Sequence, residues 1–215
     1  MKTSSRILAF DLHANDAVVA SYLDGKQSQY SFPNDRNTAC RVQATIQTML
    51  HATNLSIAAF DVFAYHCGPG RFSGLRLAAG LVHAMAFVGG QRIVPCSGLL
   101  NMALQAYAVS QTTLPIAAIV PHQQSKGFYC AVYQYRGGQW VTILEPVHVD
   151  SLSVVEGYDC CVSNQRLPLL EHKDGYVFSP NISTLLDYAM IQADTSVSTK
   201  NIQLDYLTKN LFKPN

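Results

Sequence analysis

The sequence predicts an α/β protein whose two halves follow one structural plan. Three short predicted strands open each half, at residues 7–11, 17–23 and 27–32 and again at residues 116–120, 128–135 and 140–144. In each half, a pair of turn residues separates the last two runs: Asp24-Gly25 in the first half and Gly137-Gly138 in the second. Such pairs between strand-forming runs favour a tight hairpin. We therefore expect each half to begin with three antiparallel strands.

Helical segments follow these strands. Residues 35–52 place Val42, Ile46 and Met49 on one face at the spacing of an α-helix. The pattern then alternates as a strand at 57–65, a helix at 73–87, a strand at 92–95 and a helix that ends near residue 110. Three strands followed by alternating helix and strand, built twice, predict an actin-like duplicated fold with a shortened second lobe. We place the N-terminal lobe at residues 1–110 and the C-terminal lobe at residues 111–215.

Composition and charge exclude several classes of protein. The chain has 215 residues, of which 48% are hydrophobic, and this is enough for a sizeable core. Fifteen Lys and Arg against fourteen Asp and Glu give a net charge of +1, without the basic surplus of an autonomous nucleic-acid binder. No apolar run approaches the roughly 20 residues that span a bilayer, and the N-terminus lacks the long apolar core of a signal peptide. We expect a cytoplasmic protein that does not enter a membrane.

The cysteines indicate neither disulfides nor a zinc site. Six cysteines are few for a chain of this length, and Cys160 and Cys161 are adjacent, which fits neither a dense disulfide framework nor the spacing of zinc ligands. We expect buried thiols.

The stretch from Gly68 to Arg76 reads GPGRFSGLR and joins a predicted strand to a predicted helix. A Walker A loop needs four residues between its glycines and then a lysine, but Gly70 and Gly74 are too close and Leu75 stands in place of the lysine. The spacing of Gly68, Gly70 and Gly74 also departs from the dinucleotide-binding pattern. We interpret these glycines as parts of a tight structural turn in which Ser73 caps the helix. Its amides could also hold an anion.

The helix after this loop is apolar nearly all round. Arg76 and His83 mark one line along it, flanked by the small residues Ala79 and Gly80. A helix with two apolar faces has to be covered on both. Two readings stay open: the helix is buried inside one domain, or the line of small residues packs against a helix of another subunit.

This loop resembles the G-P-G-S-F-T-G-[VL]-R motif of the TsaB (YeaZ) family, from which it departs at Arg71 and Ser73. The opening residues 6–11 resemble the family's R-I-L-A-I-D, residues 94–97 its V-S-[TS] strand end, and residues 205–207 its closing Y-L-R. The resemblance implies an actin-like fold. It also implies a non-catalytic subunit, without a cofactor, of the bacterial assembly that makes N6-threonylcarbamoyladenosine at adenosine 37 of tRNA.

The resemblance further implies the partners. The protein would pair with the catalytic paralogue TsaD and join the ATPase TsaE, form a homodimer when alone, and meet tRNA only through the complex. We expect the pairing surface to lie on helix one and on the helix after the glycine loop. The expected interface residues are Ala39, Gln43, Gln47, Arg71, Phe72, Leu75, Arg76, Ala79, Gly80 and His83.

Outside the glycine loop, the chain departs from the family pattern at four places. Leu12 replaces the threonine after strand one, Thr38 stands near the helix-one histidine, Pro121 begins the segment that replaces D-A-R, and Thr208 replaces the closing arginine. An actin-fold ATPase needs an acidic group at the strand end of each half to hold magnesium. Only Asp11 is present, so we expect no ATP hydrolysis.

No catalytic group and no metal site are predicted. His66 and Cys67 are adjacent on an extended segment, where neighbouring side chains point to opposite sides, so a reactive pair is disfavoured. Asp11 is interpreted as a turn residue rather than a residual metal ligand. Tyr129, Tyr133 and Tyr135 are taken as sheet and core residues rather than an RNA-stacking platform. The alternative functions are an independent small-molecule kinase or ATPase of the actin superfamily and a peptidase, for which no nucleophile is found.

Overall fold

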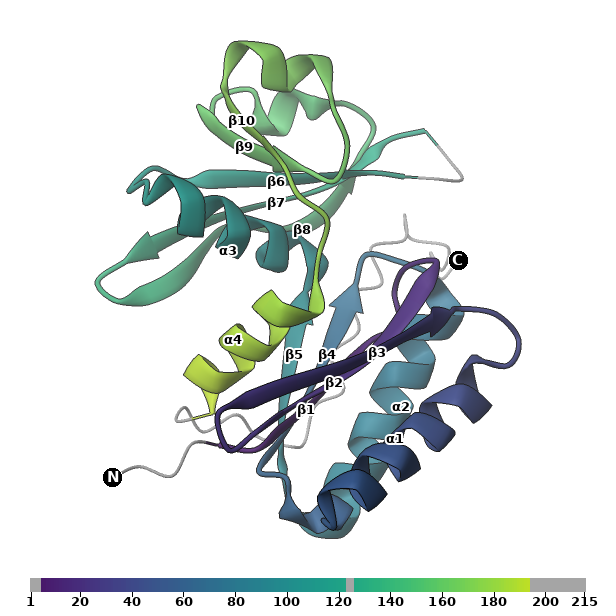
Figure 1. Cartoon of the computed structure of the whole chain (residues 1–215). Coiled ribbons are helices and arrows are strands. Elements are labelled where there is room, and N and C mark those ends of the chain that lie inside the picture. Colours follow the sequence, from purple (N-terminus) through teal and green to yellow (C-terminus); the bar gives the residue numbers. More distant parts are fainter. Residues whose placement is uncertain (1–4, 123–125, 194–215) are drawn as a thin grey trace, which may run out of the picture. The chain divides into compact units, whose positions relative to one another are not determined.

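The computed structural model describes residues 5–122 and 126–193, which form two compact units (Figure 1). The first unit contains β1 (Ile7–Asp11), β2 (Asp16–Leu23), β3 (Lys26–Pro33), α1 (Thr38–Thr53), the 3-10 helix η1 (Ile57–Ala59), β4 (Val62–Gly68), α2 (Phe72–Gly89), β5 (Arg92–Ser97) and α4 (Ile182–Gln192). The second contains α3 (Gly98–Ser110), β6 (Ile116–Pro121), β7 (Phe128–Arg136), β8 (Gln139–Val149), η2 (Leu152–Val155), β9 (Cys160–Ser163), η3 (Pro168–His172) and β10 (Asp174–Val177).

The two units contain sheets of the same topology. The strand order is β3-β2-β1-β4-β5 in the first sheet and, read in the corresponding direction, β8-β7-β6-β9-β10 in the second. In each sheet three consecutive strands pair antiparallel, and the first of them pairs in parallel with a strand that comes later in the chain. The predicted duplicated α/β fold of actin-like type is therefore confirmed.

Both predicted hairpins are present. Leu23 pairs with Lys26 around Asp24 and Gly25, whose φ angles are 49° and 84°. Gly137 and Gly138 form the corresponding turn of the second sheet with φ angles of 55° and 84°. A two-residue turn with positive φ at both positions matches the twist of the strands it joins, which explains why these residue types were informative.

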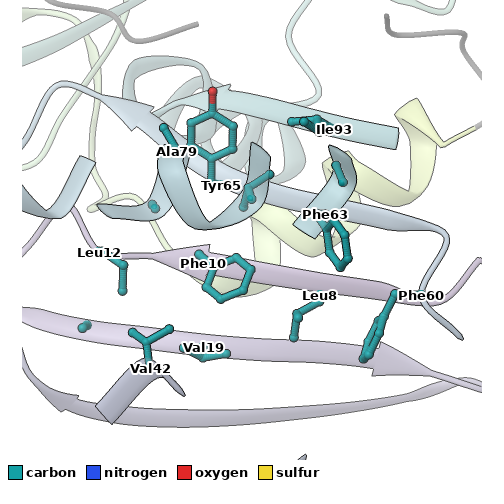
Figure 2. Packing of buried hydrophobic residues seen from close by; sticks show 14 of the residues in the cluster. Leu8, Phe10, Leu12, Val19, Val42, Phe60, Phe63, Tyr65, Ala79 and Ile93 are labelled. Atoms are coloured by element: carbon teal, nitrogen blue, oxygen red, sulfur yellow. The ribbon is translucent and has the colours of Figure 1, made fainter. Parts of the chain in front are cut away.

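Helices cover both faces of the first sheet (Figure 1). Helices α1 and α2 lie on one face, and α4 packs against β1, β2 and β4 on the other. Alternation along β1 directs Leu8 and Phe10 towards the α1 and α2 side, where they join Phe63 and Tyr65 of β4 in one core cluster (Figure 2). The side chain of Asp11 consequently belongs to the opposite face.

Helix α2 is the one helix among the described residues whose length and apolar composition would also allow it to cross a membrane. In this structure its inner face packs on the sheet: Ala78, Ala79, Val82 and Ala86 are at most 2% exposed. Core helices of soluble proteins have the same composition, so this feature carries no argument for a membrane.

The second sheet is covered by α3 on one face and by η2 and the segment around η3 on the other. Leu99 and Met102 of α3 pack with Ile116 and Tyr133. Val155 and partly buried leucines near η3 pack with Ile119 on the opposite side. Tyr129 packs at the edge of the α3 cluster, and Tyr135 contacts Tyr107 and Trp140, so the interpretation of these tyrosines as sheet and core residues is confirmed.

The unit boundaries differ from the predicted lobes. The first unit ends at Cys96 rather than near residue 110, because α3 packs on β6, β7 and β9 of the second sheet. The chain then returns to the first unit at Asn181, because α4 packs on β1 and β4. One element also differs: residues 57–59 of the predicted strand form the 3-10 helix η1, and β4 begins only at Val62.

Candidate functional site

The glycine loop joins the end of β4 to the start of α2. Gly68 has a φ angle of +132°, which glycine adopts without strain. Helix α2 begins at Phe72 with Arg71 as its N-cap residue, so the prediction that Ser73 caps the helix is wrong. The backbone N–H of Arg71 instead donates to the carbonyl oxygen of His13 at 2.8 Å. The helix therefore begins two residues earlier than a Ser73 cap would place it.

The loop glycines allow the segment after β1 to approach closely. A Cβ atom added at Gly70 would lie 2.7 Å from the Cβ of His13, and one added at Gly74 would lie 2.9 Å from the carbonyl carbon of Leu12. Contacts below about 3 Å require the backbone to shift, so a larger residue at either position displaces the β1–β2 loop. The structural interpretation of these glycines is therefore supported, because protein backbone occupies the space beside them.

Asn34 ties this region together, and sequence reasoning missed it. Its side-chain amide donates to the carbonyl oxygens of Leu12 at 2.9 Å and Ala14 at 2.8 Å. Its own side-chain oxygen accepts from Thr38 Oγ1 at 3.0 Å, and its backbone carbonyl accepts from Arg71 Nη1 at 2.9 Å. Asn34 thus fixes the β1–β2 loop, the start of α1 and the glycine loop to one another. The turn residues Pro33 to Asp35 were the only signal of this position in the sequence.

Asp11 lies at the centre of a cluster with two histidines. In the parallel register of β1 and β4, Phe10 lies beside Tyr65, so the next residues, Asp11 and His66, are neighbours on the same face. His13 follows Asp11 by two residues and returns to it. Both Nδ1 atoms face Asp11 Oδ1, that of His66 at 3.3 Å and that of His13 in direct contact. The imidazole rings are 4.9 Å apart and packed edge to face.

The cluster is buried, and its charges act on one another. Burial raises the pKa of Asp11, but the facing imidazoles of His66 and His13 outweigh this and hold the pKa well below its usual range. Burial lowers the pKa of His66, which the Asp11 carboxylate opposes. The ionised carboxylate is thus the favoured form of Asp11, and its two oxygens accept hydrogen bonds or bind a cation.

The cluster corrects one expectation and supports another. Asp11 has two imidazole partners, so its interpretation as an isolated turn residue is incomplete, although the backbone N–H of His13 does donate to it. Cys67 belongs to the hydrophobic cluster under α1 and α2, on the side of β4 opposite His66. His66 and Cys67 therefore lie on opposite sides of β4, as the alternation of an extended segment predicts. An Asp-x-His pair at a strand end was the sequence signal for the cluster.

The expected interface residues in and just before α2 fall into two groups, one exposed and one buried. Arg71, Phe72, Arg76 and Gly80 are exposed and His83 is partly exposed. Leu75 and Ala79 are only 4% and 2% exposed, so their assignment to a partner surface is wrong. Ala79 belongs to the core cluster with Tyr65, whose ring needs the space that a small residue leaves (Figure 2). The small residue that suggested a close helix-helix contact serves the close approach of α2 to its own sheet.

The outer face of α2 carries large apolar side chains. Phe72 is 49% exposed, Phe87 91% and Val88 86%. The guanidinium of Arg76 stacks 3.8 Å from the centre of the Phe72 ring. A Cβ atom added at Gly80 would meet nothing within 4 Å, so this face is open at its centre. We refer to Phe72, Arg76, Gly80, Phe87 and Val88 as the outer face of α2.

Helix α1 places its three expected interface residues, Ala39, Gln43 and Gln47, at exposed positions. Cys40 on the same helix is exposed as well, which corrects the expectation that all six thiols are buried. Among the positions that depart from the family pattern, Thr38 is buried in the Asn34 network, Pro121 ends β6, and Thr208 lies outside the described residues. Residues 205–207 and Gln123 also lie outside the described residues.

Comparison with known proteins identifies relatives along most of the chain. A family model described as TsaD, tRNA N6-adenosine threonylcarbamoyltransferase, matches residues 34–206. The tRNA threonylcarbamoyladenosine biosynthesis protein TsaB of Escherichia coli is 25% identical over 96% of this chain and 96% of its own length. The TsaB protein of Haemophilus influenzae is 29% identical over 113 residues, which are 53% of this chain and about half, 48%, of that protein.

Solved structures share the fold. YeaZ from Pseudomonas aeruginosa superimposes with a TM-score of 0.73 at 22% identity, covering 94% of this chain and all of that one. A second structure, described as similar to peptidase YeaZ from the same organism, gives a TM-score of 0.74 at 20% identity over 95% of this chain. At these identities the likeness establishes the architecture.

Proposed function

The chain belongs to the TsaD family of tRNA N6-adenosine threonylcarbamoyltransferases, and from this premise we propose that it works in the synthesis of threonylcarbamoyladenosine in tRNA. The TsaB names of its relatives, one of them matched along nearly its whole length, support this assignment. We propose more specifically that it is a non-catalytic subunit that pairs with TsaD. TsaE and tRNA would join through that complex.

The outer face of α2 is the observation that carries the proposed pairing. Phe87 and Val88 expose most of their side chains and Phe72 about half, and a monomer rarely leaves large apolar groups so open. Aromatic residues and arginine are the groups that contribute most to protein interfaces, and Arg76 lies among them, stacked on Phe72. In the absence of TsaD, a second copy of the chain would cover the same face and form a homodimer.

The region around the glycine loop does not fit a phosphate-transfer site, and this supports a non-catalytic role. The space beside Gly70 and Gly74 is occupied by the backbone of Leu12 and His13. At the matching strand end of the second sheet, β6 ends at Pro121 without a carboxylate. These features disfavour the kinase and ATPase alternative, because such enzymes hold magnesium and phosphate between acidic strand ends and an open glycine loop.

The decisive experiment is co-purification of the chain with tagged TsaD from the same cell, for the parent protein and for Gly80→Glu. Position 80 is exposed and has room for a side chain, so the variant should keep the fold of the parent. A charge at the centre of the outer face should weaken TsaD binding by at least about tenfold, since burying an unpaired charge in an interface is costly. Ser28→Glu, on the exposed strand β3, is the matched control and should bind as the parent does.

Two results of this co-purification would contradict the proposal. Equal TsaD binding by Gly80→Glu and the parent would remove the outer face of α2 from the interface. Absence of TsaD binding by the parent itself would contradict the proposed pairing.

A further inference from the structure

The cluster of Asp11, His13 and His66 has the donor set of a metal site. One carboxylate and two imidazoles are ligands that zinc takes in proteins, and the three ligand atoms all lie within 4.8 Å of one another. None of the three residues belongs to the outer face of α2, and the proposed pairing with TsaD does not use them.

The spacing of the ligand atoms suits a single ion. Two ligands of a tetrahedral zinc ion with bonds of about 2.0–2.1 Å are separated by roughly 3.3 Å. Asp11 Oδ1 and His66 Nδ1 are 3.3 Å apart, and His13 Nδ1 faces the same oxygen. His13 Nδ1 lies in direct contact with this oxygen, closer than two ligands of one ion, so the imidazole of His13 has to move away from Asp11 for all three atoms to bind the ion.

The backbone holds the three residues in place from two independent directions. Asp11 and His66 are adjacent across the parallel pair β1 and β4, in the centre of the sheet. His13 is fixed by its carbonyl group, which accepts the N–H of Arg71, and by the close packing of Gly70 against its Cβ atom. Ligands on a rigid framework lose little conformational entropy when they bind an ion.

Burial and access are both compatible with an ion. His66 is 1% exposed and Asp11 5%, and buried charged groups are stable when they are paired or coordinate a metal. The side chains of Asp11 and His13 keep 7% and 10% of their surface accessible to solvent. Three protein ligands leave one position for water, as in zinc sites that are open to exchange.

We propose that Asp11, His13 and His66 form a binding site for one Zn²⁺ ion, with water as the fourth ligand. The site is separate from the partner surface. It is a feature of this chain that neither the glycine loop nor the names of its relatives suggest.

The experiment uses the full chain after treatment with EDTA and removal of the chelator. Titration with Co²⁺ should give visible d–d absorption that saturates at one equivalent, and Zn²⁺ should displace the cobalt. His13→Gln should lower the affinity by at least about 100-fold, beyond the 10–100-fold that loss of an outer hydrogen-bond partner costs. His172→Gln and His51→Gln remove exposed histidines and should leave both affinity and stoichiometry unchanged.

Several results would overturn the proposal. One is the absence of a saturable signal at one equivalent in the parent protein. Another is a signal that survives in His13→Gln and disappears in His172→Gln, which would assign it to surface histidines. Because His66 is buried, the parent and His66→Gln are also compared by thermal unfolding with and without Zn²⁺. The ion should raise the melting temperature of the parent and not that of the variant. An unchanged melting temperature of the parent would count against the site. TsaD co-purification is measured on the same variants, so failure of the metal site and failure of the proposed pairing are distinguishable.

Discussion

The inner and outer faces of α2 both carry apolar side chains, but only those of the inner face are buried. On the inner face, Ala78 and Ala79 are small and buried against the large sheet residues Phe10 and Tyr65. On the outer face, Phe72 and Phe87 are large and exposed. Small residues on the inner face let the helix lie close to the sheet, and the exposed large apolar residues on the outer face are available to a partner. The exposure of large apolar side chains therefore distinguishes the outer face from the inner face.

The largest effect is expected from a charge on the inner face. Ala79→Glu places a carboxylate among apolar side chains with no partner, and this should lower the free energy of unfolding by about 3 kcal/mol or more. Urea denaturation followed by circular dichroism measures the change. Gly80→Glu, one residue further along the helix, is the control and should keep or slightly raise the midpoint of the parent, because glutamate has a higher helix propensity than glycine. A folded Ala79→Glu protein with the parent's midpoint would mean that the inner face has been assigned to the wrong side of the helix.

A smaller effect separates two glycines of the same helix. Gly74→Ala forces a methyl group against the backbone of Leu12, so its free energy of unfolding should fall by about 1–3 kcal/mol. Gly80→Ala meets no neighbour and should gain up to about 1 kcal/mol, because alanine has the higher helix propensity. Thermal unfolding of both variants beside the parent gives the comparison. Two changes of the same sign would show that local helix propensity, rather than contact with the β1–β2 loop, determines the outcome.

The smallest effect concerns reactivity rather than stability and extends the comparison to α1. Cys40 is exposed, whereas the other five thiols are buried. Burial, with a contribution from Cys161, raises the pKa of Cys130 to about 12 and that of Cys160 to about 11, so little reactive thiolate forms at these positions near pH 8. A thiol reagent should therefore modify one cysteine rapidly in the native protein.

Added TsaD should slow this reaction if α1 takes part in the pairing, because Cys40 lies among Ala39, Gln43 and Gln47. Cys40→Ser should remove the rapid phase altogether. A rapid phase that persists in this variant would mean that another thiol is accessible. Mass spectrometry of the labelled peptides identifies the reacting residue.

The sequence by itself determined the parts of the fold that depend on local rules. Both two-residue hairpins followed from Asp24-Gly25 and Gly137-Gly138, because few residue types accept two consecutive positive φ angles. The ends of β1 and α3 matched the apolar runs. Because the same strand pattern recurs after residue 115, the duplication was visible without any long-range contact.

Only the tertiary structure decided where those elements pack. Periodicity gives an apolar face to α2 but does not reveal which neighbour covers it, so Leu75 and Ala79 were assigned to a partner although they face their own sheet. The return of α4 to the first unit depends on contacts between residues more than 100 positions apart, which no local pattern encodes. The metal-binding arrangement has the same origin. Asp11 and His66 become neighbours only when β1 and β4 pair in parallel, and the register of that pairing is a property of the folded sheet.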